Sequence, residues 1–167
     1  DRGERHLDAI GGFACLAVGR RHPVLQRALK SARELAPPAL VQFELPPLAV
    51  ALADRLTRFL DRPEDRVFFV NSGTESMEAA MKIARASTGR PGFAHWSNAF
   101  HGLTMGALSL NGAEWLKRGF GPLVPGCHEV PFGDVGALRR TLADRSVAAF
   151  FYEPIQGKGD RKSTRLN

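Results

Sequence analysis

The stretch Val67-Phe68-Phe69-Val70-Asn71-Ser72-Gly73-Thr74-Glu75 decides the fold of this chain. Its apolar run at 67–70 is typical of a buried strand, and the amphipathic segment from Glu75 to Ser87 is typical of a helix. Ser72 and Glu75 have the spacing of a capping box, and Gly73 lets a ligand approach the backbone closely. The stretch therefore predicts a strand, a turn and a helix N-terminus whose free N–H groups suit an anion such as phosphate.

An empty helix start is the alternative interpretation, because most strand–turn–helix junctions with a capping serine bind nothing. The G-x-G-x-x-G fingerprint of dinucleotide-binding folds and the G-x-x-x-x-G-K-[ST] sequence of P-loops do not occur in this chain. A bound phosphate would therefore be held in the manner of some other fold.

The rest of the chain alternates helical and extended patterns. Helices are expected at 24–35, 47–60, 114–120 and 135–143, and strands at 92–96 and 147–152. In the helix that follows the opening turn, Met77 and Met81 fall on the apolar face, whereas Glu78 and Lys82 fall on the solvated face. This alternation predicts an α/β fold with a parallel sheet.

Ligands of parallel sheets bind at the carboxyl ends of the strands, where three stretches of this sequence should meet. These stretches are 71–75, 100–102 and 153–157. Together they could contact one small molecule. Singly, Phe100 is more often a core aromatic residue, His101 a satisfied loop residue and Glu153 a solvated strand end.

Composition excludes several classes of function. The chain has 167 residues, 44% of them hydrophobic, enough for one core, and its net charge of +6 is scattered rather than clustered on a nucleic-acid-binding face. No apolar run approaches the roughly 18 residues of a membrane helix. Cys15 and Cys127 are far apart, which favours reduced thiols in a cytoplasmic protein, and no metal-ligand spacing occurs among the histidines and cysteines.

Both ends of the sequence look incomplete or foreign. The chain starts at Asp1 without an initiator methionine, so we expect residues to be missing before it. Residues 160–167 match one reading frame of a short-read sequencing adapter, and we expect the natural sequence to stop at Gly159.

Several blocks of sequence, taken in order, resemble the class III aminotransferases of the ornithine, acetylornithine and 4-aminobutyrate type. The matching blocks are Asp8 with Gly11-Gly12, Gly19-x-x-His22-Pro23, Phe69 to Glu75 with Glu78 to Arg85, Ala99-Phe100-His101-Gly102-x-Thr104, and Glu153-Pro154-Ile155-Gln156-Gly157. The resemblance implies an incomplete fold type I of pyridoxal 5′-phosphate (PLP)-dependent transferases. Residues 1–45 would form an N-terminal segment, partly small domain and interface, 46–159 the first part of the large PLP-binding domain, and 160–167 the foreign tail.

The resemblance also implies roles for individual residues. The N–H groups of Gly73 and Thr74, with the Ser72 hydroxyl, would hold the cofactor phosphate. Phe100 would stack on the pyridine ring of the cofactor, and His101 beside it would help to shape that side of the site. Glu153 would orient the groups around the ring. More weakly, the resemblance places Phe13 in the substrate pocket. The partners implied are an amino donor, a 2-oxo acid acceptor and a second copy of the chain in a homodimer.

The lysine that forms a Schiff base with the cofactor, and the acid opposite the pyridine nitrogen, follow the Glu-Pro block in the family. Both would lie beyond Gly159, and neither Lys82 nor Lys158 matches that position, so this chain alone should be inactive. Many members have an acid where this chain has Lys158, which puts glutamate as a co-substrate in doubt. An aminomutase or decarboxylase on the same scaffold, or a non-catalytic α/β binding domain, are the alternative functions.

Overall fold

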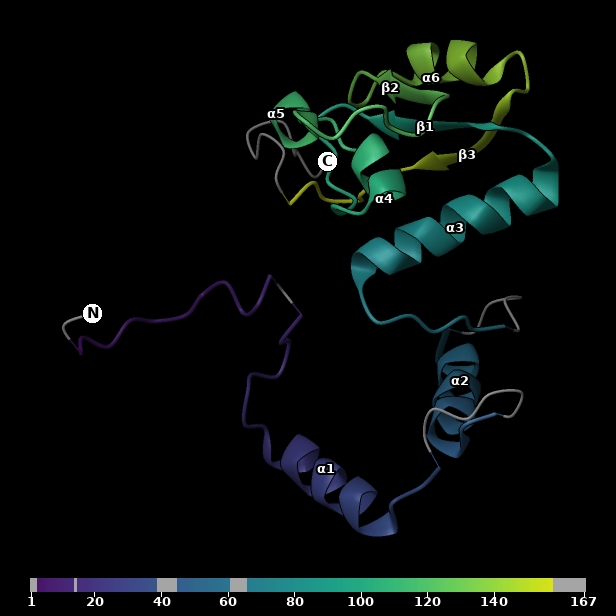
Figure 1. The fold of residues 1–167 in the computed structure, drawn as a ribbon. Helices are drawn as coiled ribbons and strands as arrows, with labels where there is room; N and C mark the ends of the chain where they lie inside the picture. Colours follow the sequence, from purple (N-terminus) through teal and green to yellow (C-terminus); the bar gives the residue numbers. More distant parts are fainter. Residues whose placement is uncertain (1–2, 14, 39–44, 61–65, 158–167) are drawn as a thin grey trace. The chain divides into compact units, whose positions relative to one another are not determined.

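The computed structural model describes residues 3–13, 15–38, 45–60 and 66–157 (Figure 1). The chain forms two compact units, Asp1–Val67 and Phe68–Asn167, and each is described by itself. Lys158 and the suspected tail at 160–167 lie outside the described residues. The expected division into residues 1–45, 46–159 and 160–167 stays a prediction.

The first unit contains two helices with the bounds that the sequence suggests. Helix α1 (Pro23–Leu35) begins at a proline, which is well suited to the first helical turn because no N–H partner is needed there. It ends at Ala36, a left-handed residue whose N–H donates to the carbonyl of Ala32. Helix α2 spans Pro47–Leu60. Neither helix buries a residue in the described part of this unit, so their apolar stripes are exposed.

The second unit is built on parallel strands in the order β2-β1-β3. Strand β1 (Gly92–Trp96) is central and pairs with β2 (Cys127–Val130) on one side and β3 (Val147–Phe151) on the other. Phe93 stands opposite both Cys127 and Ala149 in this register. The α/β class and the parallel sheet are thus confirmed.

Helices cover both faces of this sheet (Figure 1). On one face α3 (Gly73–Thr88) packs through Met81 against Phe93 and Leu110. On the other face α6 (Val135–Leu142) packs on Ala94, Val130 and Val147. Successive side chains of β1 point to opposite faces of the sheet, so Phe93 packs on the α3 side and Ala94 on the α6 side. The strand is therefore buried on both faces, as is usual in parallel sheets.

The structure differs from the sequence-based expectation at four elements. The predicted strand at 67–70 is irregular, and Phe68 and Phe69 are 72% and 44% exposed. An extended apolar run becomes a strand only when a neighbour completes its hydrogen bonds, and no strand among the described residues pairs with this one. Helix α4 (Met105–Ser109) and strand β2 were not expected, and the helix expected at 114–120 is shorter, α5 (Glu114–Lys117).

Candidate functional site

The start of helix α3 has the geometry of a capped helix N-terminus. Ser72 is extended, with φ −154° and ψ 162°, and its Oγ accepts a hydrogen bond of 3.3 Å from the N–H of Glu75. The Glu75 carboxylate accepts in turn from the N–H of Asn71 at 2.6 Å, one residue earlier than in the usual capping box. The N–H groups of Gly73 and Thr74 have no acceptor among the described residues.

Gly73 is exposed, and Thr74 is partly exposed. A Cβ atom built on Gly73 would meet no heavy atom within 4 Å, so the glycine is not required by any packing in the described structure. The two N–H groups, the Ser72 hydroxyl and the positive end of the dipole of a helix that runs to Thr88 are together suited to an anion, and this set of donors is called the anion cup below. The chemistry of this donor set fits a phosphate group, as the sequence predicts.

The loop after β1 lies directly against the first turn of α3. The Oγ1 atoms of Thr74 and Thr104 are 2.7 Å apart, and the N–H of Thr104 donates to Thr74 Oγ1 at 3.2 Å. A Cβ atom on Gly102, whose φ is +125°, would overlap the Thr74 side chain. Glycine at 102 therefore permits the close approach that brings the loop and the anion cup together.

His101 in this loop is buried, with an exposed fraction of 8%. The fully buried side chain of Asn111 holds the backbone of His101 and Gly102. Its Oδ1 accepts from the N–H of His101 at 2.7 Å, and its Nδ2 donates to the carbonyl of Gly102 at 2.8 Å. Burial lowers the pKa of the imidazole and favours its neutral form. Its Nε2 is buried and has no partner among the described residues. Thus, His101 is not an ordinary solvated loop residue.

Glu153, which follows β3, ties two loops together. Its carboxylate accepts from the N–H of Phe100 at 2.9 Å and from that of Gly157 at 3.3 Å. Nearby, the buried side chain of Gln156 donates to the carbonyl of Ser97 at 2.8 Å. These bonds fix the segment after β1 to the segment after β3, so Glu153 is a bonded acceptor rather than a free strand end.

Phe100 and His101, called the aromatic wall below, directly precede the loop residues Gly102 and Thr104 that contact Thr74. The His101 ring packs edge-on against Phe151 of β3, with 6.2 Å between the ring centroids. A cavity of about 500 Å³ opens next to Phe100 and is lined also by Asn98, Ala99, Ala113, Trp115 and Leu116. The structure thus brings the predicted residues Ser72, Gly73, Thr74, Phe100, His101 and Glu153 to the carboxyl-end edge of one sheet.

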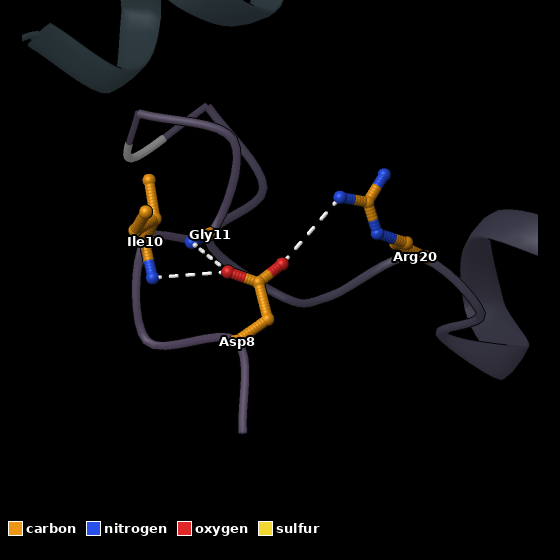
Figure 2. Close-up of polar contacts among 4 residues, drawn as sticks. All are labelled: Asp8, Ile10, Gly11 and Arg20. Carbon is orange, nitrogen blue, oxygen red and sulfur yellow. Dashed lines mark hydrogen bonds and ion pairs between the residues drawn. The ribbon is translucent and has the colours of Figure 1, made fainter. Parts of the chain in front are cut away.

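Phe13 belongs to the first unit, and its expected role in substrate binding stays a prediction. It is 85% exposed and left-handed, with φ 56°. The turn before it is held by Asp8, whose carboxylate accepts from the N–H groups of Ile10 and Gly11 at 3.0 and 3.1 Å and lies 3.5 Å from Arg20 (Figure 2). The N–H of Gly11, followed by that of Ile10, lowers the pKa of Asp8.

Sequence reasoning missed three residues of this edge. Glu78, assigned to the solvated face, accepts hydrogen bonds from Thr104, Gly106 and Ala107. Asn111 and Gln156 were not singled out as polar groups that hold the loops. A signal for Glu78 was available, because it lies one helical turn after Thr74 and so shares its face.

The described ranges 3–13, 15–38, 45–60 and 66–157 contain neither a candidate metal site nor a candidate membrane helix. No group of three or more His, Cys, Asp or Glu side chains there is placed to hold a metal ion. No helix in those ranges has the length and hydropathy needed to cross a bilayer.

Known proteins match this chain over nearly its whole length. The family model described as Aminotransferase class-III matches residues 1–162. Aminotransferase PigE from Serratia sp. (strain ATCC 39006) is 44% identical over 158 residues, which are 94% of this chain and 18% of that protein.

Solved structures share the fold. An (S)-enantioselective omega-transaminase from Thermomicrobium roseum is 30% identical with a TM-score of 0.83, over 93% of this chain and 41% of that one. The ornithine aminotransferase from Toxoplasma gondii, which holds PLP at partial occupancy in its active site, is 33% identical with a TM-score of 0.78, over 89% of this chain and 36% of that one. The chain therefore spans less than half the length of these relatives.

Proposed function

Since this chain belongs to the class-III aminotransferase family, we propose that it forms part of a PLP-dependent aminotransferase. The reaction moves an amino group between an amino acid or amine and a 2-oxo acid. The observation that carries the proposal is the anion cup at the start of α3, joined by hydrogen bonds to the loop that bears the aromatic wall. A phosphate and a planar ring are the two recognition elements of this cofactor.

The anion cup suits the phosphate of PLP in detail. Ser72 Oγ already accepts from Glu75, so its proton is free to be donated to a phosphate oxygen. The N–H groups of Gly73 and Thr74 supply two further donors along the helix dipole. These donors are neutral groups, and they bind an anion without placing a mobile cation in the site.

The aromatic wall suits the ring. Stacking on Phe100 contributes on the order of 1 kcal/mol and fixes the plane of the ring relative to the reacting bond. Glu153 acts through the backbone, because its hydrogen bond to the N–H of Phe100 fixes where that side chain starts. His101, neutral because burial lowers its pKa, places no positive charge beside the ring.

When bound, PLP supplies an electron sink that stabilises the carbanion formed at the carbon bearing the amino group. The chain described here provides binding and orientation. The lysine that attaches the cofactor and the acid opposite the ring nitrogen are expected after Gly159, so residues 1–167 alone should not catalyse transfer. Lys82 lies exposed on α3 and does not replace that lysine.

Assembly and location complete the proposal. A second copy of the chain would cover apolar side chains of α1 and α2 that are exposed, such as Leu29 and Leu52 at 53% and 49%. The chain has two cysteines, Cys15 and Cys127, far apart in sequence, a usage that favours reduced thiols in a cytoplasmic protein. We therefore propose a cytoplasmic homodimer.

Cofactor binding by the complete protein, extended through the downstream half, tests the proposal. We expect PLP to produce a visible absorbance band, borohydride to fix the cofactor to the protein, and an amine with a 2-oxo acid to exchange the amino group. Loss of carbon dioxide or migration of the amino group within one molecule would identify a decarboxylase or an aminomutase instead. Absence of both the band and borohydride fixation would contradict every PLP-dependent function.

Gly73 offers a sharper test of the anion cup. Gly73→Pro removes one N–H donor at a position where proline fits, because the preceding Ser72 is already extended. We expect PLP to bind about tenfold more weakly, as the loss of one hydrogen bond to a charged group implies. Gly73→Ala keeps the N–H and meets open space, so it is the matched control. Equal PLP affinity in the two variants would exclude the Gly73 N–H from the site.

A further inference from the structure

Glu78 links helix α3 to helix α4. A single oxygen of its carboxylate, Oε1, accepts hydrogen bonds from Thr104 Oγ1 at 2.6 Å, from the N–H of Gly106 at 2.8 Å and from the N–H of Ala107 at 3.1 Å. Thr104 is the N-cap residue of α4, yet its own side chain makes no capping bond. A side chain of another helix therefore satisfies the first N–H groups of α4, and its negative charge suits that helix end.

The hydroxyl groups of Thr74 and Thr104 link the anion cup to Glu78, and the carboxylate fixes which hydroxyl donates to which. A carboxylate accepts and does not donate, so the Thr104 hydroxyl donates its proton to Glu78. Thr104 Oγ1 must then accept from the Thr74 hydroxyl, 2.7 Å away, and Thr74 Oγ1 accepts from the N–H of Thr104. The Thr74 hydroxyl is thus fully occupied by this chain of bonds, and only its backbone N–H is left for an anion.

Two glycines make the contact between α3 and the loop as close as it is. A Cβ atom on Gly106 would overlap the Glu78 carboxylate, and one on Gly102 would overlap the Thr74 side chain. The loop that carries Phe100 and His101 is therefore held against α3 at two successive turns, through Thr74 and through Glu78.

We propose that Glu78 is a positioning residue for the cofactor: it fixes the distance between the anion cup and the aromatic wall. This inference rests on the proposed function, in which one ligand uses both. A ligand that carries only a phosphate needs the anion cup alone and is indifferent to that distance. PLP carries a phosphate and a ring, so its affinity depends on their spacing as well as on each contact.

The test compares two ligands, PLP and inorganic phosphate, on the cofactor-free complete protein by isothermal titration calorimetry. The variants are Glu78→Gln, which removes the charge, and Thr104→Val, which removes the hydroxyl between Glu78 and Thr74. Thr104→Ser keeps that hydroxyl and Glu129→Gln makes the same charge change at an exposed residue of β2, so these are the controls. We expect Glu78→Gln and Thr104→Val to weaken PLP binding about tenfold, from loss of a charge-assisted hydrogen bond, and to leave phosphate binding within about twofold.

Each other outcome is decisive. Equal losses for PLP and phosphate would show that Glu78 merely maintains the start of α3, and unchanged PLP affinity would show that it does not position the cofactor; either result overturns the inference. Should Glu78→Gln fail to fold, the valine and serine variants of Thr104 decide, because rescue by serine requires the hydroxyl. A wild-type protein that binds no PLP overturns the proposed function itself, and the inference with it.

Discussion

Replacement of Gly102 by alanine should separate the loop from helix α3. Gly102 has φ +125°, a region that side chains rarely adopt, and the strain of holding alanine there is about 1–3 kcal/mol. The new Cβ would also overlap the Thr74 side chain and lie 2.9 Å from the Thr74 Cα. Because a backbone atom cannot rotate away, the first turn of α3 must shift, which adds about 1–3 kcal/mol.

We therefore expect Gly102→Ala to lower the free energy of unfolding by about 3 kcal/mol in urea titrations of the cofactor-free protein. Gly73→Ala is the matched control, since it places the same methyl group at the same edge but in open space. Its unfolding free energy should stay within about 0.5 kcal/mol of the wild type. A Gly102→Ala protein as stable as the control would refute the reasoning, because the close contact between loop and helix would then not be needed.

Three more predictions follow from the same edge of the sheet. Asn111→Leu leaves a buried N–H and a buried carbonyl without partners, so urea titrations should show a loss of about 2–5 kcal/mol, whereas a loss under 1 kcal/mol would contradict the two bonds. Phe100→Leu removes ring stacking, and titration should show PLP affinity about fivefold lower; an unchanged affinity would exclude stacking. Burial lowers the pKa of His95 from 6.5 to about 4, so stability present above pH 6.5 is lost as the pH falls toward 4. His95→Gln should remove roughly 3 kcal/mol of that pH dependence in urea titrations from pH 7 to 4, and an identical pH profile would refute it.

Local signals were sufficient for most of the fold. Helix α2 and strand β1 have the bounds that periodicity predicts, and Pro23 marks the start of α1. These elements depend on short-range patterns, namely apolar spacing and helix-start residues, that a single sequence contains. The resemblance to the class-III aminotransferases is confirmed as well, since it rests on ordered motifs rather than on any one residue.

The features that the sequence did not predict depend on contacts between residues far apart in the chain. The run at 67–70 has strand composition, but whether it is a strand depends on a neighbour that the sequence alone does not supply. Helical spacing places Glu78 on the solvated face because it sorts residues by polarity, whereas its partners Thr104, Gly106 and Ala107 lie at the start of α4, 26 to 29 residues later. Helix α4 is short, and the side chain that accepts from its first N–H groups is Glu78 of α3 rather than its own N-cap residue Thr104, so no local capping sequence predicts it.

The two backbone donors of the anion cup have a consequence for how this protein can diverge. Every residue except proline supplies the same N–H, so the side chains at 73 and 74 can drift without erasing the capacity to hold an anion. Recognition of the phosphate thus depends on the conformation of the main chain, whereas recognition of the ring depends on side chains that substitutions can replace. New substrate preferences can then arise by changing the aromatic wall and the residues around it while the cofactor keeps its anchor.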